Sequence, residues 1–465
     1  MSDVAFAGVA RQADMLRARE LSPRELVELC LERIEKLEPE LNAFRVVLGE
    51  RALAEADQAA GRIAAGDDRP LLGVPVAVKD NVDVAGEITT HGTAAHWGPA
   101  TEDSEIVRRL RAAGAIVIGK TLLPELAAWP FTESLTFGAT RNPWDPNRSP
   151  GGSSGGAAAA VASGMVGVAH ATDGGGSIRV PAANCGLFGL KPQRGRVSLM
   201  PDPQHWHGLS VAGCVSRTVR DTGLFLDVVS GPAEGDAHTA VAPVMPFAEA
   251  AKHRPARLRI AWSTKPIQPG PVDAEVRRAV SETADLLKGL GHDVREQDPN
   301  WGLQLPAFLP RYLRGLRDDG VRLPHAERLE ARTRSLIRSG RLISDRRLKS
   351  ALAGEAKLAR RLGQTFEAYD VLMTPTMARP AEKVGRWEGR GMIWTLNSVA
   401  RYIPFTTPWN VTGQPAAAVP AGFTPGGLPL SVQLIGRPHD ETTLISLAAE
   451  IEAERPWAER RPPVS

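Results

Sequence analysis

The sequence contains few cysteines and no long apolar run. Its 465 residues include three cysteines, Cys30, Cys185 and Cys214, which form no Cys-x-x-Cys pair and cannot all be paired with one another. No run of about 18 apolar residues is present to cross a membrane, and Met1-Ser2-Asp3 does not begin a secretory signal. We therefore expect a reduced, cytoplasmic protein that does not associate with a membrane.

An excess of charge of one sign is also absent. The formal net charge is +3, because 56 Lys and Arg residues face 53 Asp and Glu residues. So small an excess gives no reason to expect a nucleic-acid partner. His205 and His207 form the only close histidine pair, and no carboxylate motif accompanies them. We expect neither a metal nor a cofactor.

Helical and extended patterns alternate along the chain. Ser22-Pro23-Arg24-Glu25 is a capping box with proline at the first helical position, and a predicted helix at 103–113 leads into a strand at 115–118. We therefore expect one large α/β domain over residues 1–465, with a mixed central β-sheet covered by helices on both faces. Residues 71–220 would form its core, and residues 256–400, which carry no chemical motif, a variable helical cap within the same domain.

Two glycine loops stand out, one over residues 151–156 (GGSSGG) and one over residues 173–179 (DGGGSIR). Glycine lets the backbone approach a ligand closely and aim its N–H groups at it. A serine at the end of such a run is a candidate nucleophile beside its own oxyanion hole, and Ser177 has this place. A hydroxyl needs a base at neutral pH, and neither loop contains a histidine.

Lys79 is the candidate base. It follows the apolar run 71–78, which we interpret as a buried strand, and burial lowers the pKa of a lysine towards the neutral form. Ser153 and Ser177 are 24 positions apart, which leaves room for a helix at 157–162 and a strand at 166–171 that would bring the two loops together. We predict a relay in which Lys79 is the base, Ser153 shuttles the proton and Ser177 is the nucleophile.

At these residues the chain resembles the amidase signature family, serine hydrolases of carboxylic amides that use a lysine and two serines. Lys79 in VKDN, Ser153 in PGGSSGG and Ser177 in DGGGSIRVPAANCGLFGLKP match the family's motifs in order and spacing. The resemblance continues through residues 410–415 and 427–436, which look like the family's closing strands.

The resemblance implies an activity and further site residues. The activity is hydrolysis of a carboxylic amide C–N bond through an acyl-enzyme on Ser177. The peptide bond before Ser153 is expected to be cis, and backbone N–H groups of the second glycine loop are expected to form the oxyanion hole. We assign oxyanion or substrate binding to the following residues: Gly174, Gly175, Gly176, Ser154, Asp173, Arg179, Trp129 and Thr132.

Other interpretations of the same motifs remain to be weighed. The glycine–serine pattern also fits a nucleophile elbow, but three prolines within residues 141–150 replace the strand that an elbow requires. Residues 114–121 (GAIVIGKT) satisfy a nucleotide-binding pattern, although the residues between its glycines read as a buried strand. Such a nucleotide-binding protein is the alternative from another class. A binding module that merely retains the fold is disfavoured because all three triad positions are filled.

Within the family the alternative is the glutamine-hydrolysing A subunit of a tRNA-dependent amidotransferase. That subunit ordinarily carries a tyrosine-rich helical stretch, whereas this chain has three tyrosines in total. We therefore expect a stand-alone amidase acting on a small apolar or aryl amide, with a homodimer left open. The candidate pocket aromatics, about a third of which should line the pocket, are Trp129, Phe131, Trp206, Tyr312, Trp394, Phe405 and Trp409.

Overall fold

The computed structural model describes residues 2–465, and two β-sheets form its centre. The five-stranded sheet has the order β1 (Phe44–Val47), β3 (Ile116–Thr121), β2 (Pro75–Lys79), β6 (Val168–Asp173) and β8 (Val211–Ser216). The six-stranded sheet has the order β10 (Asp293–Glu296), β9 (Arg259–Trp262), β11 (Val371–Pro375), β13 (Pro429–Ile435), β12 (Ala416–Phe423) and β7 (Gly189–Lys191). A short hairpin pairs β4 (Glu133–Ser134) with β5 (Gly138–Ala139).

The two sheets meet at one pair of residues. Phe188 and Ser216 exchange both backbone hydrogen bonds, with N···O distances of 3.0 and 3.1 Å. Parallel and antiparallel pairs occur in both sheets, so the expected mixed α/β architecture is confirmed. The central sheet is built as two parts joined at this bridge.

Helices pack against both sheets. α3 (Pro23–Leu41), α4 (Gly49–Ala64), α5 (Glu105–Ala112) and α6 (Gly155–Ala162) contact strands of the five-stranded sheet. α7 (Arg179–Cys185), α10 (Ala274–Gly289) and α16 (Glu441–Glu454) contact strands of the six-stranded sheet. α8 (Val219–Val229) also contacts β8, and α13 (Asp345–Ala368) contacts β11. The other helices are α1 (Ser2–Ala5), α2 (Val9–Arg17), α9 (Phe247–Ala250), α11 (Leu305–Arg322), α12 (Ala331–Arg341), α14 (Met392–Tyr402) and α15 (Pro408–Thr412).

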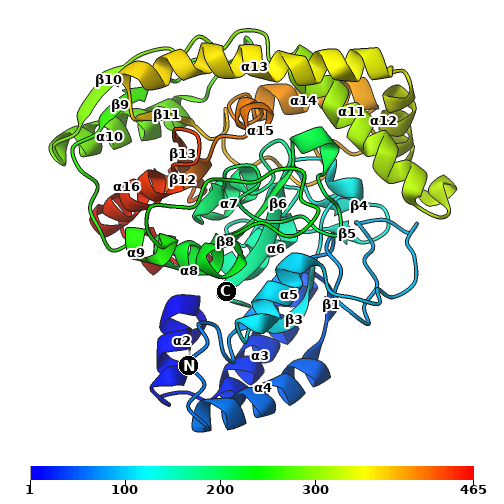
Figure 1. Cartoon of the computed structure of the whole chain (residues 1–465), viewed down its shortest axis with the longest axis vertical. Coiled ribbons are helices and arrows are strands. Elements are labelled where there is room, and N and C mark those ends of the chain that lie inside the picture. The colour runs from blue at the N-terminus through cyan, green and yellow to red at the C-terminus, as the bar shows by residue number, and fades with distance from the viewer. Residues whose placement is uncertain (1) are drawn as a thin grey trace.

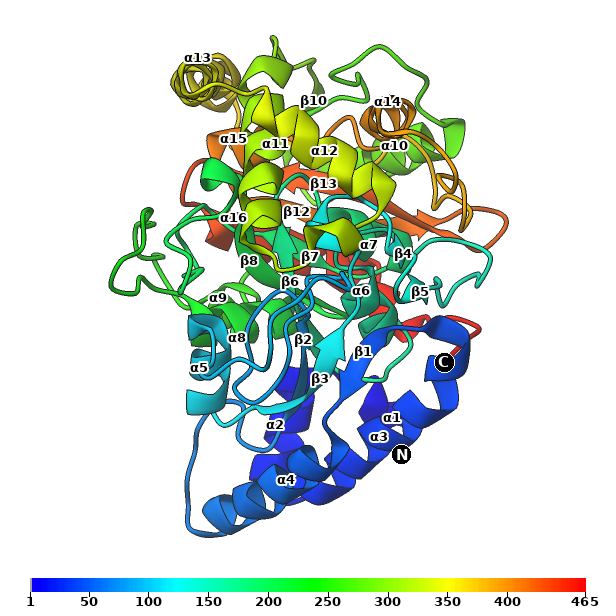
Figure 2. The same ribbon diagram turned by 90° about the vertical axis from the view of Figure 1, so that its right-hand side faces the viewer.

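The helices of the two halves lie at opposite ends of the long axis. In Figure 1, α2, α3 and α4 lie at the lower end and α11, α12 and α13 at the upper end, with β6 and β8 between them. Figure 2 shows the same separation from the side, with α3 and α4 running together. None of the helices within residues 2–465 combines the length and the apolar character that a bilayer crossing requires.

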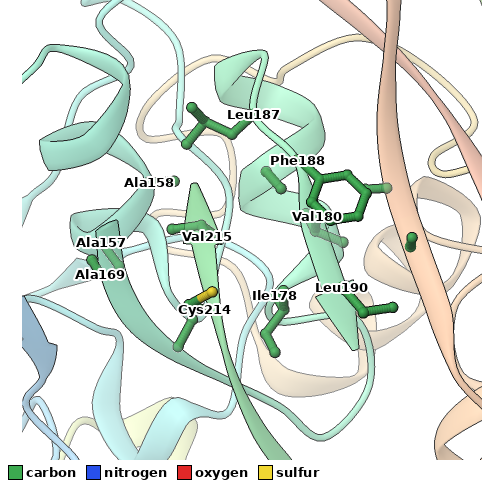
Figure 3. Close-up of a cluster of buried hydrophobic side chains, with 14 of the residues drawn as sticks. Ala157, Ala158, Ala169, Ile178, Val180, Leu187, Phe188, Leu190, Cys214 and Val215 are labelled. Atoms are coloured by element: carbon green, nitrogen blue, oxygen red, sulfur yellow. The ribbon is translucent and has the colours of Figure 1, made fainter. Parts of the chain in front are cut away.

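The core around α6 is built from very small side chains. Every residue of α6 is buried, and its apolar side chains are alanines and one valine. Figure 3 shows Ala157 and Ala158 in one apolar cluster with Ala169 of β6 and Val215 of β8. A Cβ at Gly156 would lie 2.5 Å from the Ala43 oxygen, so only glycine permits this approach of helix and strand. The first glycine loop is thereby held against the sheet.

Several sequence predictions are confirmed with small shifts of boundary. The predicted helices at 103–113 and 157–162 are α5 and α6, and the capping box at Ser22 and Glu25 begins α3. The strand predicted at 71–78 begins only at Pro75, because Gly73 turns the chain at a φ of +81°.

One expectation about the second half is wrong. Residues 410–415 do not form a strand, because Pro408 begins the short helix α15. Residues 256–400, which we expected to form a helical cap, also contain β9, β10 and β11, which extend the six-stranded sheet. The part of that range that packs over the glycine loops consists of α11 and α14.

Candidate active site

Lys79 is the last residue of β2, in the middle of the five-stranded sheet. Its side chain is completely buried, and its Nζ lies within hydrogen-bonding distance of three hydroxyl groups. These are Ser153 Oγ at 2.7 Å, Ser154 Oγ at 3.0 Å and Thr172 Oγ1 at 2.9 Å, and each hydroxyl can donate as well as accept. β2 runs parallel to β6, so Lys79 and the start of the second glycine loop emerge at the same edge of the sheet. The predicted contact between Lys79 and Ser153 is therefore present.

Burial favours the neutral form of this lysine. It lowers the pKa of Lys79 to about 7, and the carboxylate of Asp173 opposes the shift. The neighbouring imidazole adds no positive charge, because burial and the charge of Lys79 lower the pKa of His170 to about 3. His170 Nδ1 accepts a hydrogen bond of 3.3 Å from the Lys79 backbone N–H. Near neutral pH, Lys79 can therefore both lose and regain a proton.

The first glycine loop, which carries Ser153, packs closely against the backbone around Phe131. The Gly152–Ser153 peptide bond is cis, as the family resemblance implies. A Cβ at Gly152 would lie 2.5 Å from the Phe131 nitrogen, so no larger residue fits there. Thr132 Oγ1 donates to the Gly151 oxygen at 2.9 Å and accepts from the Gly155 N–H at 3.1 Å. Thr132 thus holds the loop and does not line the substrate cavity, contrary to its expected substrate-binding role.

An ion pair buried behind the second glycine loop fixes its shape. Asp173 and Arg179 are both fully buried and lie 2.9 Å apart. The Asp173 carboxylate accepts the N–H groups of Gly176 at 2.7 Å and Ile178 at 3.1 Å. Burial would raise the pKa of Asp173, but Arg179 and Asn410 hold it well below its ordinary value.

Arg179 is held from several sides. It donates to Asn410 Oδ1 and Gln433 Oε1, both at 2.7 Å, as well as to Asp173. All its hydrogen bonds run within the protein and it does not line the cavity. Asp173 and Arg179, which we expected to bind substrate, do not line the cavity, and their hydrogen bonds hold the second glycine loop.

The second glycine loop leaves some of its N–H groups free. Within residues 2–465, the N–H groups of Gly174, Gly175 and Ser177 form no hydrogen bond, and neither does Ser177 Oγ. The Gly176 N–H is taken by Asp173, so it is not available to an oxyanion in this conformation. Gly176 instead supplies the backbone shape, because its φ is +133°. The candidate oxyanion donors are thereby reduced to three.

Ser177 opens onto a cavity of about 320 Å³. Gly175, Gly176 and Ser177 form one wall, and residues of α11 and α14 form the opposite one. No acidic, basic or histidine side chain lines it in the part of the chain described here. Its polar side groups are those of Ser177, Trp206, Gln268, Gln304, Tyr312, Asn397, Thr407 and Trp129.

Three of the seven candidate aromatics line this cavity: Trp129, Trp206 and Tyr312. Phe131, Phe405 and Trp409 are core residues, and Trp394 is 44% exposed on α14 outside the cavity. Sequence reasoning missed the apolar residues of the opposite wall, namely Leu305, Phe308, Leu309, Ile393, Leu396, Val399 and Ile403. Their helical spacing on α11 and α14 was a usable signal for an apolar face, but not for what that face covers.

A second cavity of about 230 Å³ has Thr172 in its lining. It is more polar, and His205, Ser210 and Asp319 are among its lining residues. His205 hydrogen-bonds to Ser210 Oγ at 2.7 Å and to Asp319 Oδ2 at 3.0 Å, so its ring is engaged within the protein. Because this cavity does not include Ser177, the larger cavity is the candidate substrate site.

The sequence and the fold match a known class of enzymes. A family model described as Amidase matches residues 25–445. A Mycobacterium tuberculosis (strain ATCC 25618 / H37Rv) protein named "Putative amidase AmiB2" is 52% identical over 467 residues, which cover 100% of this chain and 99% of that protein. The chain belongs to the amidase family.

Solved structures agree with this assignment. The structure of 6-aminohexanoate cyclic dimer hydrolase complexed with substrate has a TM-score of 0.91 at 31% identity, with 99% of each chain covered. A bacterial aryl acylamidase of the amidase signature family has a TM-score of 0.87 at 26% identity, with 97% of each chain covered. The protein is an enzyme that hydrolyses amide C–N bonds.

The nucleotide-binding interpretation of residues 114–121 finds no support in the fold. Ile116 to Thr121 form strand β3, and Lys120 is fully buried with its Nζ 2.8 Å from Asp80. A phosphate-binding loop needs unpaired N–H groups, whereas β3 pairs with β1 on one side and β2 on the other.

Proposed function

We propose that Ser177 is the nucleophile of this amidase, with Ser153 as proton relay and Lys79 as base. The observation that carries the proposal is the 2.7 Å hydrogen bond between Lys79 Nζ and Ser153 Oγ, at a lysine whose pKa is lowered to about 7. Ser177 itself faces the cavity beside unpaired backbone N–H groups. In unliganded enzymes the remaining catalytic hydrogen bonds often tighten only when substrate binds.

The acylation half-reaction uses these groups in sequence. Ser177 Oγ attacks the amide carbon, its proton passes to Ser153 Oγ, and the Ser153 proton passes to Lys79 Nζ. The N–H groups of Gly174, Gly175 and Ser177 are placed to stabilise the oxyanion that forms. When the C–N bond breaks, the proton returns through Ser153 to the nitrogen, and ammonia or an amine leaves.

Deacylation repeats the same transfers with water. Water adds to the acyl carbon and gives its proton through Ser153 to Lys79, and the returning proton restores the Ser177 hydroxyl. One amide and one water yield one carboxylic acid and one amine. Ser154, which also accepts a hydrogen bond from Lys79, keeps the lysine in place in this scheme.

The cavity favours an uncharged apolar or aryl acyl group. It carries no ionic side chain to pair with a charged substrate, and burying an unpaired charge there would be costly. Phe308 and Tyr312 are stacked with ring centroids 5.7 Å apart, so they offer a flat apolar surface opposite Ser177. A stand-alone amidase of small amides is thus favoured over the amidotransferase subunit.

A cytoplasmic location is part of this proposal. The three cysteines are buried and free, which suits a reducing compartment. Sedimentation of the purified protein distinguishes a monomer from a homodimer.

Covalent labelling tests the assignment of the nucleophile. A fluorophosphonate should form its adduct on Ser177, and mass mapping of the digested protein locates that adduct. Ser177→Ala should not be labelled, whereas Ser154→Ala, which keeps the relay, should still be labelled. An adduct on Ser153 or Ser154, together with continued labelling of Ser177→Ala, would contradict the assignment of Ser177 as the nucleophile.

A further inference from the structure

Gln304 brings a buried side-chain amide to the wall of the cavity. It is the residue before α11, its exposed fraction is 4%, and it lines the cavity together with Ser177. Its backbone oxygen begins α11 by accepting the N–H groups of Ala307 and Phe308, both at 3.0 Å. Its side chain forms no capping hydrogen bond. The start of the helix therefore does not depend on this side chain.

One hydrogen bond orients the Gln304 amide. Thr407 Oγ1 donates to Gln304 Oε1 at 2.6 Å. Thr407 directly precedes α15, and α11 and α15 pack against each other in the upper half of Figure 1. Because the amide is planar and its oxygen is held by Thr407, the direction of its Nε2 group is fixed as well.

The Nε2 group of Gln304 has no partner in the protein. Within residues 2–465 it forms no hydrogen bond, and it is not one of the fully enclosed side-chain atoms that lack a partner. The small exposed surface of Gln304 therefore includes this nitrogen, and the space that Gln304 lines is the cavity. An oriented N–H donor is thus open to a ligand there.

The other polar groups of the cavity are engaged, enclosed or less buried. Tyr312 donates to a backbone oxygen and Trp206 to a carboxylate, both at 2.8 Å. Trp129 Nε1 has no partner but is fully enclosed. The side chain of Gln268 is half-buried and that of Asn397 is exposed. In the described part of the chain, the amide that precedes α11 is the buried side-chain donor that a ligand can reach.

This donor lies close to the loop that carries Ser177. A Cβ at Gly175 would lie 3.7 Å from Thr407 Cγ2 and 3.3 Å from the Phe308 ring. Phe308 follows Gln304 by four residues, so the two side chains share one face of the helix. An acyl group that is attached to Ser177 and fills the cavity therefore contacts the face of α11 that begins at Gln304.

We propose that Gln304 determines substrate preference by donating a hydrogen bond from Nε2 to an uncharged acceptor oxygen on the acyl group. The inference rests on the proposed role of Ser177 as the nucleophile. A purely apolar acyl group would displace water from the cavity and leave the N–H without a partner, which is costly. An acyl group with a carbonyl or ether oxygen avoids this cost. The acceptor is uncharged, because no cationic side chain within residues 2–465 lines the cavity to pair with an anion.

Matched pairs of substrates measure this preference. 3- and 4-acetylbenzamide carry a carbonyl oxygen that 3- and 4-isopropylbenzamide lack, at nearly the same size. The quantity is kcat/KM for the acetyl amide divided by kcat/KM for its isopropyl partner. For at least one of the two positions, this ratio should fall about tenfold from the wild type to Gln304→Met. The difference in chemical reactivity between the two amides is the same for every variant and cancels.

Three further variants sharpen the test. Gln304→Glu keeps an acceptor for Thr407, but its carboxylate has no N–H to donate, so the ratio should fall as in Gln304→Met. Thr407→Val removes the hydroxyl that orients the amide and should lower the ratio by less. Gln58→Met is the matched control, because Gln58 is exposed on α4 at the opposite end of Figure 1; its ratio and kcat should be those of the wild type. Circular dichroism confirms that each protein is folded.

The outcomes separate this proposal from the one on which it rests. An unchanged ratio at both positions in Gln304→Met would overturn the role of Gln304, and so would a wild type that hydrolyses only the isopropyl amides. If Gln304→Met does not fold, the ratio of Gln304→Glu decides. If Ser177→Ala hydrolyses these amides like the wild type, the proposed nucleophile itself is wrong, whatever the ratio.

Discussion

The two walls of the cavity are built in opposite ways. The wall that carries Ser177 comes from β2, α6, β6 and the glycine loops, where nearly every side chain is buried and ion pairs fix the backbone. The opposite wall comes from α11 and α14, whose side chains in the cavity are mostly apolar and mostly half-buried or exposed. We infer that the first wall performs the chemistry and that the second selects the acyl group. Changes in the first should act on turnover, and changes in the second on substrate preference.

The largest effect should follow replacement of Lys79. Lys79→Ala removes the base and should lower kcat by at least about 10²–10⁴, the range of general acid–base catalysis. Lys79→Arg should be no better, because arginine does not deprotonate in a protein. Steady-state kinetics on one amide measures both variants. An Arg variant with substantial activity would place the base elsewhere.

A smaller loss should follow a change in the shape of the second glycine loop. Gly176 has a φ of +133°, and a Cβ there would lie 2.9 Å from Thr406 Oγ1. Gly176→Ala should move the oxyanion donors and lower kcat by about 10²–10³, the usual cost of one donor.

Gly175→Ala is the matched control. Its Cβ would lie 3.3 Å from the Phe308 ring, which can yield, so its loss of kcat should be smaller. Comparison of kcat for the two variants decides this point. A larger loss of kcat in Gly175→Ala than in Gly176→Ala would mean that Gly176 does not determine the shape of the second glycine loop.

Substitutions in the opposite wall should change the selectivity between substrates. Phe308→Ala removes part of the stacked aromatic surface, so kcat/KM for an aryl acyl amide should fall about tenfold relative to that for acetamide. Leu342→Ala, on an exposed residue outside the cavity, should leave the ratio unchanged. If Phe308→Ala slows both amides equally, α11 contributes to catalysis and the contrast between the walls fails.

The smallest effect should follow replacement of Ile393, at the exposed edge of the cavity. Ile393 lines the cavity but is 70% exposed, so Ile393→Ser should change KM by less than about threefold. Its free energy of unfolding should stay within about 0.5 kcal/mol of the wild type, as for most surface changes. Denaturant unfolding and kinetics on the same preparation check both numbers. A large loss of stability would mean that α14 depends on this side chain.

The sequence predicted the catalytic wall far better than the selective one. Lys79, Ser153 and Ser177 lie in short motifs whose glycines have direct physical meaning, and the structure brings Lys79 into contact with Ser153. The opposite wall pairs residues such as Phe308 and Leu396 with loops more than a hundred positions earlier. No local pattern encodes such a contact, because it depends on how α11 and α14 pack.

Errors at single residues have physical causes of the same kind. Arg179 ends the second glycine loop and Thr132 precedes the first one in the sequence, yet their hydrogen bonds run to Asp173 and to the loop backbone and not towards the cavity. The helix α15 was predictable, since proline in a first turn, here Pro408, is a signal for the start of a helix.

The pH dependence of acylation tests the central claim, that Lys79 is a neutral base, most directly. Lysine is active only when deprotonated, and burial lowers the pKa of Lys79 from 10.5 to about 7. Pre-steady-state acylation by an activated amide should therefore become faster as pH rises from 6 to 8 and level off above that. An acylation rate that falls over this range, with the fold intact by circular dichroism, would contradict a neutral Lys79.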